Sequence, residues 1–235
     1  MHRLVLWNID LTLVDVARVS RDAYAEAFRK VTGRPLVALP QLAGASDSEI
    51  FFESLALNEA VPRSAIAEDN DLLARYATEL AAAFGARSEQ LATQGRPLTG
   101  AREALAAVSR LPGAIQTVIT GTIRQNAASK LNAFGLDRYL DLGIGGYGSD
   151  VYPKGTQIVR SLVMAAEKYS VQFTPGHAVY VADSVRDAAA AHVADVRCLG
   201  VATGRSTISE LRDAGADPVL SDLADTSRVV AAISQ

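Results

Sequence analysis

Cysteine and histidine are scarce in this chain of 235 residues. Its single cysteine, Cys198, excludes an intramolecular disulfide and a cluster of metal-binding thiolates. Cys198 lies within an apolar stretch, so we expect it in the core. The three histidines, at positions 2, 177 and 192, lack the spacing of a metal site. We therefore expect neither a zinc-type centre nor an oxidising environment, and the sequence favours the cytoplasm.

An excess of positive charge and long hydrophobic runs are also absent. The formal net charge is -3 and the isoelectric point is about 5.6, so nucleic acid and anionic membranes are not expected partners. No run approaches the roughly 20 apolar residues of a membrane span. The apolar stretch that follows Met1 is too short for a signal peptide. We expect a protein that acts on a small molecule, as a monomer or as a homodimer.

Short apolar runs without helical period, each ending in polar residues, are the strongest structural signal that is present. Such runs are typical of buried parallel strands. They lie at residues 4–9, 115–119, 139–144, 178–182 and 197–202, with a weaker one at 218–220. Helical patterns separate them, at residues 100–110, 123–134, 154–169 and 187–194. Alternating strands and helices predict an α/β fold, a doubly wound, Rossmann-like parallel sheet.

Residues 16–96 interrupt this alternation. About eighty residues pass with helical periodicity and no convincing strand. We therefore predict two domains. Residues 1–15 and 97–235 would form the α/β core, and residues 16–96 would form an inserted all-helical domain.

Polar residues follow the predicted strands, where ligands bind in sheets of this kind. They are Asn8, Asp10 and Thr12; Thr120 and Gly121; Lys154; and Asp183 and Asp187. Oxygen donors on adjacent strand ends suit Mg²⁺ shared with a substrate phosphate. A hydroxyl, backbone amides and a lysine would bind the remaining phosphate oxygens.

Each of these residues has an ordinary structural explanation when taken alone. A strand that ends in Asn or Asp is usually a turn or a helix cap. Asp183 followed by Asp187 is also typical of a helix start. A lone lysine such as Lys154 is more often solvated. Their joint order at successive strand ends favours a common site.

The same residues give the chain its resemblance to the haloacid dehalogenase superfamily. The first motif, Asp-x-Asp-x-Thr, corresponds to Asn8-Ile9-Asp10-Leu11-Thr12. The second, a Ser or Thr that ends an apolar strand, corresponds to Thr120, and the third, a Lys, to Lys154. The fourth, Gly-Asp-x-x-x-Asp, corresponds to the segment from Ala182 to Asp187. The layout resembles phosphoglycolate phosphatase-like members that carry a helical C1-type cap.

This resemblance implies a role for each matching residue. Position 8 would hold the nucleophile, and Asp10 would be the general acid and base. Thr12, Thr120, Gly121 and Lys154 would bind the phosphoryl group, and Thr120 and Lys154 would also act in catalysis. The implied cofactor is Mg²⁺, held by the side chain of Asn8, the backbone carbonyl of Asp10 and the carboxylate of Asp183, with Asp187 in support.

The helical insert resembles the family's cap, which closes over the active site and selects the substrate. Asp15 lies at its start, near the expected hinge. Within it, Gly44-Ala45-Ser46-Asp47 is similar to a specificity loop often written Gly-Arg-Thr-Asp, which makes Asp47 a candidate for substrate binding. The arginine of that loop is missing here.

Asn8 departs from the family pattern at the most important position. An amide is a poor nucleophile and carries no charge with which to hold Mg²⁺. The asparagine is explained by a natural non-catalytic member, by an introduced Asp-to-Asn substitution or by a variant mechanism. Leu11 and Ala182 also replace glycines of the pattern, which favours natural divergence.

The leading hypothesis from sequence is therefore a Mg²⁺-dependent phosphatase of a small phosphorylated metabolite, with its activity in question at Asn8. One alternative is a binding or regulatory protein that keeps the phosphate pocket without turnover. The other is a 2-haloacid dehalogenase, whose chemistry also needs the nucleophilic aspartate but does not use Mg²⁺.

Overall fold

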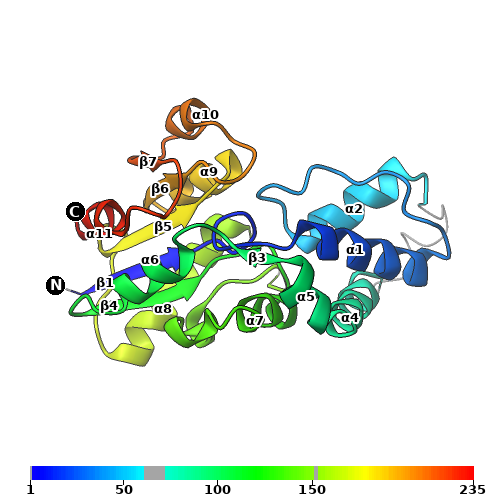
Figure 1. Ribbon diagram of the computed structural model, residues 1–235, viewed down its shortest axis with the longest axis horizontal. Helices are drawn as coiled ribbons and strands as arrows, with labels where there is room; N and C mark the ends of the chain where they lie inside the picture. The colour runs from blue at the N-terminus through cyan, green and yellow to red at the C-terminus, as the bar shows by residue number, and fades with distance from the viewer. Residues whose placement is uncertain (1, 61–71, 151–152) are drawn as a thin grey trace.

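The computed structural model describes residues 2–60, 72–150 and 153–235. A five-stranded parallel sheet lies beside a lobe of helices (Figure 1). The predicted α/β fold with a Rossmann-like sheet is confirmed. Within the described ranges, no helix has the length and apolar character needed to cross a membrane.

The strands lie in the order β4-β1-β5-β6-β7, and all neighbouring pairs are parallel. They are β1 (Arg3–Trp7), β4 (Ala114–Val118), β5 (Ala178–Ala182), β6 (Arg197–Val201) and β7 (Val219–Leu220). The chain goes from β1 to β4 on one side and then to β5 on the other, so the strand order reverses at β1. Such a reversal opens a crevice at the carboxyl ends of the strands, where ligands bind in these folds.

The prediction of a strand at residues 139–144 is wrong. The chain there forms two short 3-10 helices, η1 (Asp137–Tyr139) and η2 (Leu142–Ile144). The side chain of Asp141 accepts a hydrogen bond from the amide of Gly143 at 3.0 Å, which starts the second turn. The segment passes along the edge of β4, where the amide of Asp141 donates to the carbonyl of Gln116 at 2.8 Å, and just beyond it Gly146 forms a bridge with Ile119. Its apolar residues are therefore covered without an extended backbone.

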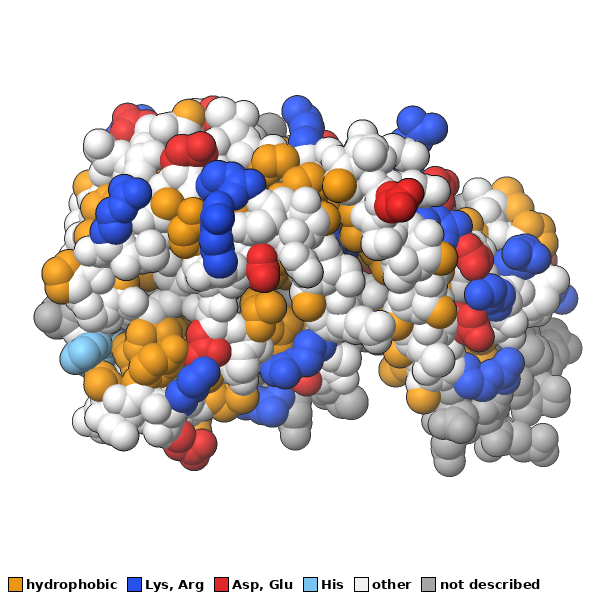
Figure 2. Space-filling model, turned by 60° about the horizontal axis from the view of Figure 1, so that its bottom comes forward, with side chains coloured by type: hydrophobic (Ala, Val, Ile, Leu, Met, Phe, Trp, Pro, Cys, Tyr) orange, Lys and Arg blue, Asp and Glu red, His pale blue; other side chains and the backbone are white. Residues whose placement is uncertain are grey.

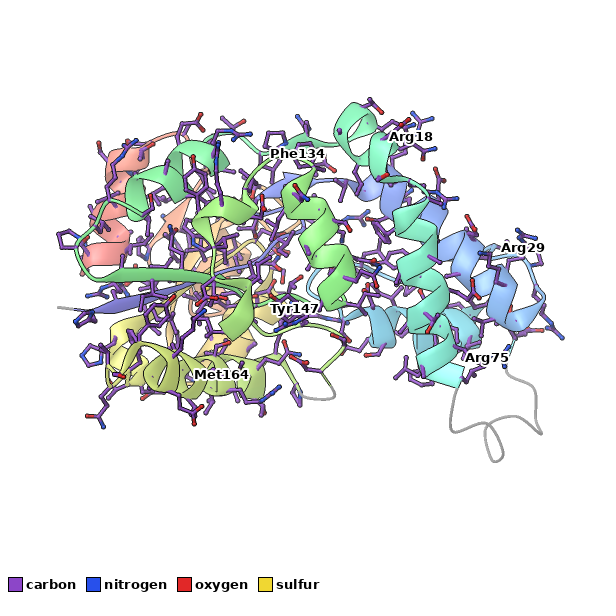
Figure 3. The ribbon with its side chains drawn as sticks, turned by 90° about the horizontal axis from the view of Figure 1, so that it is seen from below. Arg18, Arg29, Arg75, Phe134, Tyr147 and Met164 are labelled. Atoms are coloured by element: carbon purple, nitrogen blue, oxygen red, sulfur yellow. The ribbon has the colours of Figure 1, made fainter. Side chains whose placement is uncertain are left out.

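Alternate residues of β1 pack on opposite faces of the sheet, as the period of a strand requires. Val5 and Trp7 pack in one apolar cluster, and Leu4 and Leu6 pack in another. The first face is covered by α6 (Ala101–Val108), α7 (Arg124–Asn132) and α11 (Thr226–Ser234). The second is covered by α8 (Lys154–Tyr169), α9 (Val185–Val193) and α10 (Ile208–Asp213). Figure 3 shows α8, marked by Met164, across the sheet from α6 and α11.

The helical lobe contains α1 (Ala17–Thr32), α2 (Asp47–Leu57), α4 (Leu72–Gly85) and α5 (Ser88–Gln94). Its aromatic centre is Phe51, whose ring stacks on Tyr76 with centroids 4.0 Å apart and meets the edge of Phe28 at 6.4 Å. A ribbon of β2 (Val14–Asp15) and β3 (Arg96–Pro97) joins the lobe to the sheet. These helices occupy the predicted insert at 16–96, of which residues 61–71 lie outside the described residues. The domain boundaries themselves stay a prediction.

Most charged side chains lie at the surface, and most apolar residues of the strands lie in the core. Basic and acidic side chains are interspersed over the face shown in Figure 2. Cys198 is buried in β6, as predicted. The four β1 residues from Leu4 to Trp7 have no exposed surface. Burial of each such side chain contributes about 1.5–3 kcal/mol, which fixes the strand whose end carries the first motif.

Candidate active site

One cavity of about 330 Å³ lies between the carboxyl ends of the strands and the helical lobe. Its floor includes Asn8 and Asp10 after β1, Thr120 and Gly121 after β4, Asp183 after β5, and Lys154 at the start of α8. The structure therefore brings most of the predicted site residues together. We call this space the central cavity. Its volume is in the range of small-molecule sites.

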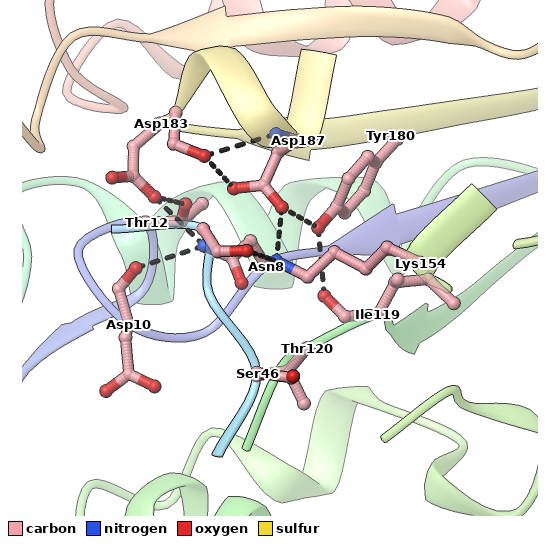
Figure 4. Close-up of polar contacts among 12 residues, drawn as sticks. Asn8, Asp10, Thr12, Ser46, Ile119, Thr120, Lys154, Tyr180, Asp183 and Asp187 are labelled. Carbon is pink, nitrogen blue, oxygen red and sulfur yellow. Dashed lines mark hydrogen bonds and ion pairs between the residues drawn. The ribbon is translucent and has the colours of Figure 1, made fainter. Parts of the chain in front are cut away.

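Asn8 is buried and donates two hydrogen bonds across the floor. Its Nδ2 lies 2.9 Å from Oδ1 of Asp183 and 3.1 Å from the carbonyl oxygen of Asp10 (Figure 4). A carboxylate and a carbonyl are both acceptors, so only the NH₂ side of the amide can face them. An aspartate at position 8 could not make either bond.

Asp183 is almost fully buried at the end of β5. Its Oδ1 also accepts a hydrogen bond from the hydroxyl of Thr12 at 2.7 Å. Burial raises the pKa of Asp183 to about 7, and the charge of Asp187 adds to this, while the bonds from Thr12 and Asn8 oppose it. Gly204 packs directly against the other carboxylate oxygen, and a Cβ at that position would overlap it. A side chain at position 204 would therefore displace the Asp183 carboxylate.

Lys154 and Asp187 form an ion pair beneath the cavity. Lys154 Nζ lies 2.5 Å from Oδ1 of Asp187 and 3.2 Å from the carbonyl oxygen of Gly44. Asp187 also accepts hydrogen bonds from Tyr180 and from Ser184, the N-cap residue of α9. Asp187 is fully buried and does not line the central cavity. Both oxygens of Asp187 therefore accept hydrogen bonds within the protein, and its support of a cation stays a prediction.

Asp10 has a partner that the sequence analysis missed. Lys130 Nζ lies 2.8 and 2.7 Å from the two carboxylate oxygens of Asp10 and donates to Thr122 Oγ1 at 3.0 Å. Thr122 in turn donates to Asp10 at 2.9 Å. The Lys130 side chain is only 1% exposed, and it also lies over the ring of Phe84 in α4. The available signal was its position, because Lys130 lies on the apolar stripe of α7 with Ala127 and Leu131.

Asp47 connects the helical lobe to the sheet. Its Oδ1 accepts a hydrogen bond from Tyr24 at 2.7 Å, and its Oδ2 accepts one from the amide of Ile123 at 2.8 Å. Its own amide donates to the carbonyl of Gly121 at 2.8 Å. Asp47 lines the cavity, but both carboxylate oxygens are engaged in the protein. The contacts that the structure shows for Asp47 are therefore those of a bridge between the two parts of the chain.

The remaining motif residues hold the backbone of the floor in place. A Cβ on Gly121 would overlap the carbonyl of Ala45, so Gly121 permits the close approach of the lobe. Thr120 is buried, and its Oγ1 accepts a hydrogen bond from the amide of Thr122 at 3.2 Å. Leu11 has φ of 59°, in the left-handed region that favours glycine. This explains why the family pattern has glycine there.

Two arginines also line the central cavity. Arg21 comes from α1 in the lobe, and Arg205 comes from the loop after β6. Beside them, the Ser20 hydroxyl is buried and has no hydrogen-bond partner within the described part of the chain. These groups make the outer part of the cavity suitable for an anionic or hydroxylated ligand.

The groups expected to hold Mg²⁺ do not fit a cation as they are arranged. The side chain of Asn8 presents N–H donors to the two oxygens that would share the metal with it. Among the described residues, no three His, Cys, Asp or Glu side chains meet in a way that could hold a metal ion. Mg²⁺ prefers six oxygen ligands, several of them waters, so a donor in this place competes with it.

Comparisons with known proteins agree with the fold. A family model described as haloacid dehalogenase-like hydrolase matches residues 5–192, and a second, described as HAD-hydrolase-like, matches residues 159–226. The chain has no match among curated protein sequences.

Solved structures are similar over almost the whole chain. A hydrolase from Pseudomonas syringae is 20% identical with a TM-score of 0.67, and the match covers 98% of this chain and 97% of the other. A predicted phosphoglycolate phosphatase from Haemophilus somnus is 19% identical with a TM-score of 0.65, covering 97% and 98%. A predicted phosphatase from Clostridium acetobutylicum is 16% identical with a TM-score of 0.64, covering 98% and 99%. At these identities the likeness establishes the fold alone.

Proposed function

Because the chain belongs to the haloacid dehalogenase-like hydrolase family, we propose that its central cavity is a phosphoric monoester site for a small phosphorylated metabolite. The observation that carries the proposal is the convergence of Asp10, Thr120 and Lys154 on one cavity beneath the helical lobe. Structural neighbours described as phosphatases support the choice of phosphate esters over haloacids. The layout is phosphoglycolate phosphatase-like.

In this proposal, Asp10 is the group that moves protons. Lys130 and Thr122 hold both of its carboxylate oxygens, and the side chain is 39% exposed, so it can reach a ligand oxygen or a water. The hydroxyl of Thr120 and the ammonium group of Lys154 would bind the phosphate oxygens. Each of these side chains lines the same cavity.

Asn8 limits the reaction that this framework can carry out. An aspartyl-phosphate cannot form on an amide, so the covalent step of the family is not open to this chain. Loss of a catalytic nucleophile elsewhere has cost on the order of 10⁴ to 10⁶ in rate. We therefore propose that turnover by the chain is slow and that Asn8→Asp restores it, with Mg²⁺ as the cofactor of the restored form. The cytoplasmic location stays a prediction.

A second candidate function is binding of a phosphorylated ligand without turnover. The two hydrogen bonds of Asn8 favour it, because they satisfy the floor of the cavity without a nucleophile. Such a protein would act as a sensor or a regulator of a metabolite.

Phosphate release from a panel of metabolite esters tests the proposal. We expect release by Asn8→Asp at least about a thousandfold faster than by the parent chain, and its loss in Asn8→Asp/Asp10→Asn. If Asn8→Asp is inert on the whole panel, the phosphatase proposal fails. A thermal shift of the parent with an ester that is not hydrolysed would favour the binding function.

A further inference from the structure

The NH₂ group of Asn8 occupies the place between two oxygens that a shared cation would otherwise bridge. Nδ2 lies 2.9 Å from Asp183 Oδ1 and 3.1 Å from the carbonyl oxygen of Asp10. The hydroxyl of Thr12 donates to the same Asp183 oxygen at 2.7 Å. Both acceptors are therefore satisfied by protein hydrogens, which removes the penalty for burying them unpaired.

The formal charges at the floor of the cavity are also nearly balanced without a cation. Asp10 and Asp187 each pair with a lysine, Lys130 and Lys154, and Asp183 is the one carboxylate of this group that is held by neutral donors. The five groups carry one formal negative charge when all are ionised. An aspartate at position 8 would add a second negative charge beside Asp183 and would remove the hydrogen bond that Asn8 donates to it.

We infer that the Asn8 amide takes the place of the divalent cation, so that the cavity binds a phosphate group without Mg²⁺. The inference rests on the proposed function for the nature of the ligand only. For Mg²⁺ to enter, both Asn8 hydrogen bonds must break and the amide must turn to present its oxygen. The ion would then gain a neutral ligand in place of an anionic one. Affinity for hard cations falls as the ligand set loses negative charge.

Arg21 and Arg205 supply cationic charge that a phosphate dianion would meet in the absence of a metal. Both line the cavity, and no ion pair engages either guanidinium within the described part of the chain. Lys154 also lines the cavity, but its charge is paired with Asp187, so the two arginines supply the unpaired positive charge. Arginine is well suited to this role because its donors match phosphate geometry.

Calorimetric titration with Mg²⁺ alone tests the first half of the inference. The proteins are the parent chain, Asn8→Asp, and Asn132→Asp as a control that adds the same charge at an exposed position outside the cavity. We expect Asn8→Asp to bind Mg²⁺ at least about tenfold more tightly than the parent or the control. Equal affinity of the parent and Asn8→Asp would overturn the inference.

Thermal shift with inorganic phosphate tests the second half. The parent should be stabilised equally in excess EDTA and in excess Mg²⁺, whereas Asn8→Asp should need Mg²⁺ for the shift. A parent that responds to phosphate only with Mg²⁺, or in neither condition, contradicts the inference. Neither experiment requires hydrolysis, so its result is separate from the phosphate-release test of the proposed function.

Discussion

The ion pair between Lys130 and Asp10 should respond unequally to the loss of its two partners. The Lys130 side chain is 1% exposed, whereas that of Asp10 is 39% exposed. Asp10→Asn leaves a buried ammonium group without its anionic partner, a change that usually costs 3–5 kcal/mol. We expect about 3 kcal/mol, because the Asp47 carboxylate also interacts with the Lys130 charge. Lys130→Met keeps the packing on Phe84 and lets Asp10 turn to water, at a cost of about 1 kcal/mol.

Urea unfolding followed by circular dichroism measures these differences. The two single variants should differ by about 2 kcal/mol, roughly 30-fold in the unfolding equilibrium. For a domain of this size, Asp10→Asn should lower the Tm by about 6–12 °C. The double variant Asp10→Asn/Lys130→Met should recover most of the loss, since it removes the stranded charge. If Lys130→Met lowers the free energy of unfolding as much as Asp10→Asn does, or if the two losses simply add in the double variant, then Lys130 is not the buried charge that depends on its partner.

Three further predictions concern the other polar groups of the cavity. The pKa of Asp183 is raised to about 7 in the folded state. Between about pH 4 and pH 7 the folded state therefore keeps a proton on Asp183 that the unfolded state has released, and stability falls as the pH rises through this window. Asp183→Asn keeps an oxygen acceptor for Asn8 and Thr12. It should reduce this loss of stability with rising pH, and should raise the free energy of unfolding at pH 8 by on the order of 1–3 kcal/mol. A pH series of urea midpoints identical to that of the parent would count against the raised pKa of Asp183. Asp47→Ala leaves the buried Tyr24 hydroxyl and the Ile123 amide without their acceptor, and should lower the free energy of unfolding by about 2–4 kcal/mol and speed amide exchange at Ile123. As a control, Thr207→Ala at the exposed N-cap of α10 should lower it by about 1 kcal/mol and leave the Ile123 amide protected. Arg205→Gln should weaken the binding of a phosphate ester several-fold while unfolding stays within about 0.5 kcal/mol of the parent; unchanged binding would remove Arg205 from the ligand site.

The sheet could be predicted because its strands are buried on both faces. The runs at β1, β4, β5 and β6 are mostly apolar, although β1 and β6 begin with an arginine and β4 contains Gln116 and Thr117, and each run is followed by a polar segment. The run at 139–144 is similarly apolar but lies at the sheet edge, where Asp141 accepts a hydrogen bond from the amide of Gly143 and starts a turn. Composition alone does not separate these cases, because both bury apolar side chains.

The floor of the cavity was predictable where it depends on strand ends. Asn8, Asp10, Thr120 and Asp183 follow strands that are neighbours in the sheet, so the fold alone brings them together. Lys130 was not predicted, because its partner lies 120 residues away and a lysine in a helix is usually solvated. The position of Asp187 also depends on tertiary contacts, since Tyr180 and Lys154 turn its carboxylate away from the cavity. Long-range pairing of charged groups leaves little trace in local sequence.

We propose that position 8 alone separates this cavity from a working phosphoryl-transfer site. The intact mass of the protein after incubation with a small phosphoryl donor and Mg²⁺ tests this. We expect that Asn8→Asp gains the mass of one phosphoryl group and that Asn8→Asp/Asp10→Asn keeps it for longer, while the parent chain keeps its own mass. A parent chain that becomes phosphorylated, or an Asn8→Asp variant that is stabilised by phosphate but never modified, would contradict the claim.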